Sequence, residues 1–112
     1  MNKTIIVVED DNDIRELLQD LLEGEGYLVE TASNGREGLD KLKTKSVDLI
    51  LLDLMMPVLD GRGFLAEYGG SAPVIVVTAV GERSGLPAGA AGVLTKPLHI
   101  EELLTVIKQH AC

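Results

Sequence analysis

Residues 47–57 read VDLILLDLMMP, a run that is apolar apart from two aspartates, of which Asp53 stands near its end. A short, continuous apolar run bounded by polar and turn residues is typical of a strand that is buried on both faces. A carboxylate at the end of such a strand is costly to bury unless another group pairs with it. The partners of Asp53 therefore have to come from elsewhere in the chain.

Other apolar runs predict the rest of a sheet around Val47–Leu52. Ile5–Val8 and Val74–Val77 are short and rich in β-branched residues, as buried strands usually are. Tyr27–Thr31 and Gly92–Thr95 fit strands less strongly. These segments together predict a sheet of five strands.

The segments between the strands show helical spacing of their apolar residues. We expect helices over Ile14–Leu22, Asn34–Lys43, Gly61–Tyr68 and Ile100–Ile107. For the first helix, Asn12 or Asp13 is available as N-cap and Gly24 as the stop. Residues 81–92, GERSGLPAGAAG, contain four glycines and Pro87, which work against a full helix there.

Strands that alternate with helices indicate a parallel sheet that is covered on both faces and built from right-handed crossovers. The expected fold class is therefore α/β, a flavodoxin-like (βα)5 doubly wound five-stranded parallel sheet with a shortened or irregular fourth helix. The 112 residues show no linker, internal repeat or low-complexity tract, so we expect residues 1–112 to form a single domain.

The composition excludes several function classes. A net charge of −8 argues against a nucleic-acid-binding surface or a patch for anionic membranes, and it suits cations or a partner with a basic face. The lone cysteine, Cys112, allows no internal disulfide, which fits a reducing compartment. The apolar start of the chain is too short for a signal peptide or a membrane span. We expect a cytoplasmic domain.

Polar residues gather where the predicted strands end, and in a parallel sheet ligands bind at that edge. Glu9 and Asp10 follow the first strand, Asp53 ends the third, Thr78 ends the fourth and Lys96 follows the fifth. Clustered carboxylates repel one another unless a cation neutralises them, and oxygen ligands select a hard ion such as Mg²⁺. A lysine and a hydroxyl on the same edge suit a phosphoryl group.

Across nearly its whole length the chain resembles the receiver domains of response regulators in two-component signalling, the CheY-like family. The resemblance rests on IIVVEDDNDIR at 5–15, DLILLDLMMPVLDG at 48–61, VIVVTA at 74–79 and LTKPL at 94–98. It implies a regulatory domain that accepts a phosphoryl group from a sensor histidine kinase or a phosphotransfer protein and then switches conformation. Such a domain is not an enzyme, because it assists only its own phosphorylation and dephosphorylation. Its signal passes to a downstream protein target or to an output domain, which these 112 residues do not contain.

The same resemblance assigns the metal site. Asp53 is expected to be the phosphoacceptor, and Mg²⁺ is expected on Asp10, Asp53 and the backbone carbonyl of Met55. Glu9 would act on the metal through water.

The resemblance also assigns the residues that bind phosphate and transmit the switch. Lys96 should pair with Asp53 at rest and with a phosphoryl oxygen afterwards, and Thr78 should move to bond the phosphoryl group. Pro97 should follow a cis peptide bond, which would aim Lys96 inward. Val93 stands where the family often has a switch aromatic, so the usual coupled movement of threonine and aromatic cannot operate as such.

Three other interpretations compete with this one. A pseudo-receiver would bind proteins without phosphorylation-driven switching; Val93 and the segment 81–92 favour it, whereas the intact Asp10 and Asp53 disfavour it. A metal-dependent phosphohydrolase needs a second acid where this chain has Met55. A mononucleotide-binding flavodoxin relative would have to hold phosphate against EDDND at 9–13, which repels it. The sequence leaves the kinase, the signal, the target and the oligomeric state open.

Overall fold

A computed structural model describes residues 2–54, 59–78 and 89–111 of the chain. It contains one five-stranded sheet in the order β2-β1-β3-β4-β5, and all neighbouring strands are parallel. The strands are β1 (Thr4–Val8), β2 (Leu28–Ala32), β3 (Leu49–Asp53), β4 (Val74–Thr78) and β5 (Gly92–Thr95). The predicted fold class is confirmed.

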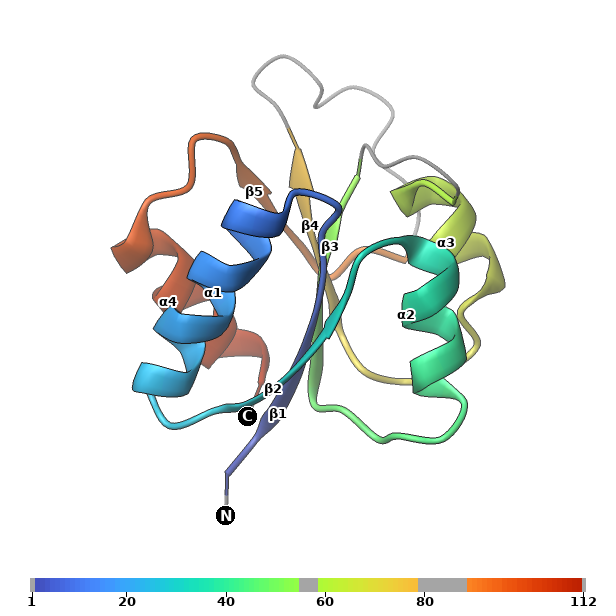
Figure 1. Cartoon of the computed structure of the whole chain (residues 1–112), viewed down its shortest axis with the longest axis horizontal. Coiled ribbons are helices and arrows are strands. Elements are labelled where there is room, and N and C mark those ends of the chain that lie inside the picture. Colours follow the sequence, from blue (N-terminus) through green and yellow to red (C-terminus); the bar gives the residue numbers. More distant parts are fainter. Residues whose placement is uncertain (1, 55–58, 79–88, 112) are drawn as a thin grey trace.

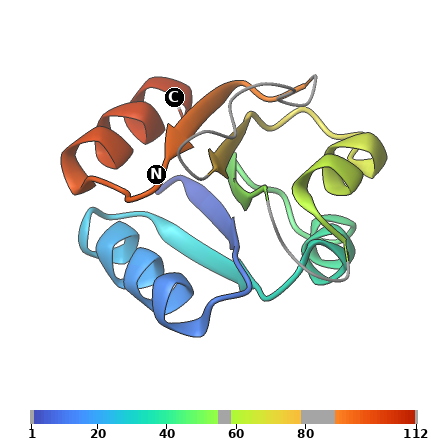
Figure 2. The same ribbon diagram turned by 90° about the horizontal axis from the view of Figure 1, so that it is seen from above.

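Helices cover both faces of this sheet. In the described part of the chain they are α1 (Asn12–Gly24), α2 (Gly35–Leu42), α3 (Gly61–Glu67) and α4 (Ile100–His110). Figures 1 and 2 show α1 and α4 on one face, here named the α1/α4 face, and α2 and α3 on the other, the α2/α3 face. The irregular helix expected within residues 81–92 falls largely on residues 79–88, which lie outside the described residues. No described helix is both long and apolar enough to cross a membrane.

The start of α1 differs from the prediction, because its N-cap is Asp11 and not Asn12 or Asp13. The backbone of Asp11 is extended, and its carboxylate accepts hydrogen bonds from the amides of Asp13 and Ile14 at 2.9 and 3.1 Å. An N-cap must lie just outside the helix so that its side chain reaches back to these amides. Asn12 is already helical and cannot serve.

The end of α1 also differs from the prediction. Gly24 is the last helical residue, and the left-handed conformation that closes the helix belongs to Gly26, with a φ of 95°. The amides of Gly26 and Tyr27 donate to the carbonyls of Glu23 and Leu22 at 3.0 and 3.1 Å. Glycine is the usual residue at this position because it has no Cβ to clash.

Side chains on the strands alternate between the two faces, as in any pleated strand. On β3, Leu49 and Leu51 belong to the core cluster beneath α1 and α4, whereas Ile50 and Leu52 belong to the cluster beneath α2 and α3. All five residues of β3 are buried. Asp53 follows Leu51 by two residues, so its side chain is directed to the α1/α4 face at the carboxyl edge of the sheet.

Candidate functional site

Three carboxylates meet at the carboxyl edge of the sheet. Glu9 directly follows β1 and Asp53 ends β3, and these strands are neighbours in register. Glu9, Asp10 and Asp53 each offer an oxygen, and these oxygens all lie within 4.8 Å of one another. Glu9 and Asp53 are buried and Asp10 is exposed. Ligand sets made only of carboxylate oxygens suit hard cations such as Mg²⁺.

The environment of Glu9 disfavours its negative charge. Burial, together with the neighbouring Asp53 and Asp10, raises the pKa of Glu9 from 4.5 to about 8. The amide of Asp11, which donates to Oε2 of Glu9 at 3.1 Å, acts in the opposite direction. The cluster therefore lacks positive charge, and a cation bound there would stabilise the ionised form of Glu9.

Lys96 supplies part of the missing positive charge. Its Nζ lies 3.4 Å from Oδ2 of Asp53 and 3.9 Å from Oε1 of Glu9. Its amide donates to the carbonyl of Thr78 at 2.8 Å, which fixes its position just after β5, and the Lys96–Pro97 bond is cis. A partly exposed ammonium beside a buried carboxylate can also bind an oxygen of an incoming anion.

Thr78 ends β4 with its side chain buried. Within the described part of the chain, its Oγ1 has no hydrogen-bond partner. A buried hydroxyl without a partner costs about 1–3 kcal/mol. Thr78 lies one residue beyond Val77, which pairs with Asp53 in register, so Thr78 stands at the same edge of the sheet as the acid cluster. The alternation along β4 directs its side chain to the α2/α3 face, and only a turn towards an anion at the cluster would give its hydroxyl an acceptor there.

Arg15 is a site residue that sequence reasoning missed. Its Nη1 donates to the backbone carbonyl of Glu9 at 2.8 Å, and its Nη2 contacts Oδ1 of Asn12. Arg15 and the Asp11 cap thus both stabilise the turn between β1 and α1, which carries Glu9 and Asp10. In the sequence, Arg15 is only an arginine one turn into the helix that follows the acids. That position does not predict a hydrogen bond from its side chain to the backbone carbonyl of Glu9.

Two predicted site residues remain, Met55 and Val93. Met55, expected to offer its carbonyl, lies outside the described residues. Val93 pairs with Val76 in register and packs, partly buried, against the core cluster of the α2/α3 face. The structure thus brings Glu9, Asp10, Asp53 and Lys96 together.

Comparison with known proteins identifies relatives that match most of the chain. The response regulator receiver domain family matches residues 5–108. The response regulator MprA of Mycolicibacterium vanbaalenii is 46% identical over 107 residues, which cover 89% of this chain and 46% of MprA. The chain therefore spans about half the length of the curated relatives it matches.

Solved structures agree in fold. A putative response regulator from Chloroflexus aurantiacus has a TM-score of 0.90 at 29% identity, with 99% of this chain and 98% of that chain covered. The receiver domain of the sensor histidine kinase PA1611 from Pseudomonas aeruginosa has a TM-score of 0.89 at 27% identity, covering 99% of this chain and 98% of that chain. That protein carries a magnesium ion coordinated in its active site cleft.

Proposed function

The chain belongs to the response regulator receiver domain family, the phosphoryl-accepting module of two-component signalling, and from that premise we propose that Asp53 accepts the phosphoryl group. The observation that carries this proposal is a buried strand-end carboxylate with Lys96 at 3.4 Å and two further acids beside it. The alternative of a binding module without phosphorylation is not favoured, because it would leave this costly arrangement without a use.

The proposed reaction is a transfer from a phosphohistidine on a sensor histidine kinase or a phosphotransfer protein. A carboxylate oxygen of Asp53 attacks phosphorus, the new O–P bond forms, and the P–N bond breaks. The imidazole nitrogen keeps the electron pair of that bond and takes up a proton. Lys96 then binds one phosphoryl oxygen, and the hydroxyl of Thr78 donates to another, which gives Oγ1 an acceptor. In this role the domain assists its own phosphorylation and dephosphorylation and acts on no other substrate.

We also propose that Mg²⁺ binds at the acid cluster, on Asp10, Asp53 and the carbonyl of Met55, with Glu9 acting through water. The all-oxygen donor set and the raised pKa of Glu9 support this assignment, as does the magnesium ion in the similar receiver domain of PA1611. When bound, the ion supplies positive charge against the negative charge of the phosphoryl oxygens. The bond from Arg15 to the Glu9 carbonyl and the bond from the Asp11 amide to the Glu9 carboxylate hold the turn that carries Glu9 and Asp10.

The phosphodonor protein needs a surface beside Lys96. An apolar pocket of about 260 Å³ lies there between α1 and the segment that starts α4, and Lys96 and Pro97 form part of its lining. Leu17 and Ile100 line it as well, and their exposures of 56% and 51% are high for large apolar side chains. We propose this apolar surface as the contact for the kinase or phosphotransfer protein, and a cytoplasmic location where the two meet. The downstream partner is a protein target or an output domain, as the longer relatives suggest.

Acetyl phosphate with Mg²⁺ tests the phosphoacceptor by intact mass. The parent should gain one phosphoryl group and Asp53→Asn none. Asp11→Asn is the matched control: it removes a neighbouring acid but keeps a good N-cap, so it should still be phosphorylated. Equal phosphorylation of parent and Asp53→Asn would refute the assignment, and unchanged phosphorylation of the parent in excess chelator would refute the role of Mg²⁺.

A further inference from the structure

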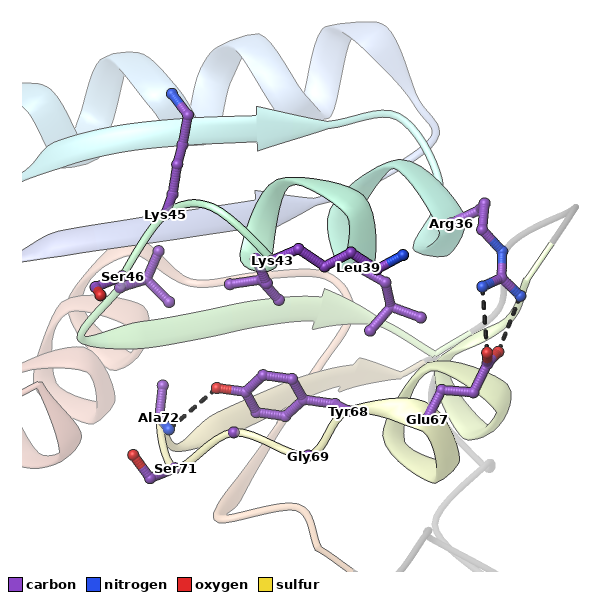
Figure 3. Close-up of a pocket in the computed structure, with 13 residues that line it drawn as sticks. Arg36, Leu39, Lys43, Lys45, Ser46, Glu67, Tyr68, Gly69, Ser71 and Ala72 are labelled. Atoms are coloured by element: carbon purple, nitrogen blue, oxygen red, sulfur yellow. Dashed lines mark hydrogen bonds and ion pairs between the residues drawn. The ribbon is translucent and has the colours of Figure 1, made fainter.

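A pocket of about 500 Å³ opens on the α2/α3 face, at the opposite end of the sheet from the acid cluster. The pocket exists because α3 is short, with 7 residues. At about 1.5 Å per residue such a helix covers only part of a strand's length. Beyond it the chain continues as residues 68–73, which form neither helix nor strand, and the pocket lies between this segment and α2 (Figure 3).

Part of the pocket wall is apolar and held in place by hydrogen bonding and ring stacking. Leu39 and the Tyr68 ring lie across from each other in Figure 3, and Val47 and Ala72 line the pocket as well. The Tyr68 hydroxyl accepts a hydrogen bond from the amide of Ala72 at 3.1 Å, and its ring stacks on Phe64 with centroids 5.9 Å apart. An aromatic or aliphatic body of modest size would therefore find a preformed slot.

The charge of the pocket is opposite to that of the chain. Its lining contains Arg36, Lys43 and Lys45 against the single acid Glu67, in a chain of net charge −8. Two of these cations already form ion pairs with acidic side chains of the protein. Arg36 donates to both oxygens of Glu67 at 3.2 and 2.9 Å, and Lys45 pairs with Glu30 at 3.2 Å and points away from the pocket in Figure 3.

Lys43 is the cation available to a ligand. Its ion pair with Asp40 spans 3.5 Å between side chains that are 74% and 60% exposed, and such pairs contribute little. Figure 3 shows its side chain running along the α2 side of the pocket past Leu39. On the opposite side, within the described part of the chain, the amides of Gly69, Gly70 and Ser71 have no protein acceptor. These amides belong to exposed residues, so together with Lys43 they offer donors that an anion could reach from solvent.

We propose that this pocket binds a small amphipathic organic anion, with its apolar body between Leu39 and Tyr68 and its carboxylate on Lys43. The volume falls within the range of about 300–1,000 Å³ that is usual for small-molecule sites. The site is independent of the phosphoacceptor, because no residue of the acid cluster lines it.

Naphthalene-2-carboxylate is a suitable probe, titrated into the whole chain and followed by amide NMR in the presence of a chelator. Saturable shifts are expected for residues 43–47 and 69–72 and not for residues 9–11. The neutral naphthalene-2-carboxamide tests the carboxylate and acetate tests the apolar body, and both should bind more weakly. Shifts confined to another region, or equal binding of the carboxamide, would overturn the proposal.

Charge variants separate a local contact from general electrostatics. Lys43→Gln should weaken binding of the probe about threefold. Lys3→Gln removes the same charge from an exposed position that does not line the pocket, so it should leave the affinity unchanged. Equal loss in the two variants would show that Lys43 does not hold the anion. If Asp53→Asn still binds the probe, the pocket is distinct from the proposed phosphoacceptor site. If Asp53→Asn no longer binds it, the two sites are not independent.

Discussion

The two faces of the sheet are covered very differently. The α1/α4 face lies beneath helices of 13 and 11 residues, whereas the α2/α3 face lies beneath helices of 8 and 7 residues. The long pair closes a large core cluster, and the alternation of β3 directs Asp53 to that same face. The short pair leaves a pocket at the other end of the sheet. The charged groups that need a fixed geometry thus lie on the face with the longer helices. The larger of the two pockets described above, about 500 Å³ against about 260 Å³, lies on the other face.

Thr78 and Val93 follow the opposite alternation. Val93 packs with the cluster of the α2/α3 face, and Thr78, two residues after Val76, is directed to that face as well. A threonine that turns towards a phosphoryl group on Asp53 would therefore disturb the more loosely covered face first. Substitutions on each face can test this contrast, beginning with those of the largest expected effect.

Truncating one leucine on each face compares their packing directly. Leu22 of α1 is fully buried, and Leu39 of α2 borders the pocket. We expect Leu22→Ala to lower the free energy of unfolding by about 4 kcal/mol and Leu39→Ala by about 2 kcal/mol, because the second cavity would merge with existing open space. Urea unfolding measures both values. Equal losses would show that the two faces are packed alike.

The acid cluster on the α1/α4 face should bind Mg²⁺ more tightly as the pH rises towards 8. The pKa of Glu9 near 8 means that its carboxyl holds a proton below that pH, and a cation beside it favours the loss of this proton. The affinity should therefore rise with pH below this pKa, by at most about tenfold, or ~1.4 kcal/mol, per pH unit. Calorimetric titration at several pH values measures it.

The stability of the metal-free protein should fall as the pH rises over the same range, whereas the Mg²⁺ affinity rises. Since the folded pKa of Glu9 lies above its ordinary value of 4.5, its contribution to stability is complete below pH 4.5 and is lost as the pH rises to about 8. Glu9→Gln serves as control, because its side chain cannot ionise. In this variant residue 9 should contribute no pH dependence to the Mg²⁺ affinity or to the stability. A parent protein whose Mg²⁺ affinity does not change over this range would contradict the account.

Thr78→Val should stabilise the unphosphorylated protein by about 1 kcal/mol, since it keeps the shape of the side chain and removes a buried hydroxyl that has no partner among the described residues. Thr105→Val is the control on an exposed surface: its hydroxyl donates to the Glu101 carbonyl at 2.8 Å, so its loss should be neutral or slightly destabilising. Thermal unfolding compares the two. A destabilised Thr78→Val would mean that the hydroxyl is satisfied at rest.

Two adjacent glycines test the wall of the pocket. A Cβ on Gly70 would lie 2.5 Å from the Tyr68 hydroxyl, whereas a Cβ on Gly69 would meet nothing within 4 Å. Gly70→Ala should therefore destabilise the fold by up to about 1 kcal/mol by displacing Tyr68, while Gly69→Ala should be neutral or slightly stabilising. Thermal unfolding with amide NMR of Ala72 distinguishes them. An undisturbed Ala72 amide in Gly70→Ala would show that Tyr68 does not depend on this glycine.

The parallel sheet, and the edge at which its polar residues gather, follow from the amino-acid sequence alone. Apolar runs and helical spacing are local patterns, and the carboxyl ends of parallel strands always share one edge, so these patterns suffice to place Glu9, Asp53 and Lys96 together. The same local character explains the errors at α1: a capping residue depends on where the backbone leaves the helix, which shifts by a residue without changing the apolar pattern.

Tertiary packing, in contrast, is the source of the raised pKa of Glu9, the hydrogen bond from Arg15 to its carbonyl and the pocket beside Tyr68. Each depends on how deeply a group is buried or how far one element extends relative to its neighbour. The shortness of α3 becomes a pocket only because α2 and residues 68–73 stand apart over the sheet that α3 fails to cover. Such differences between packed elements arise from contacts between residues far apart in the chain, which no periodicity in the sequence records.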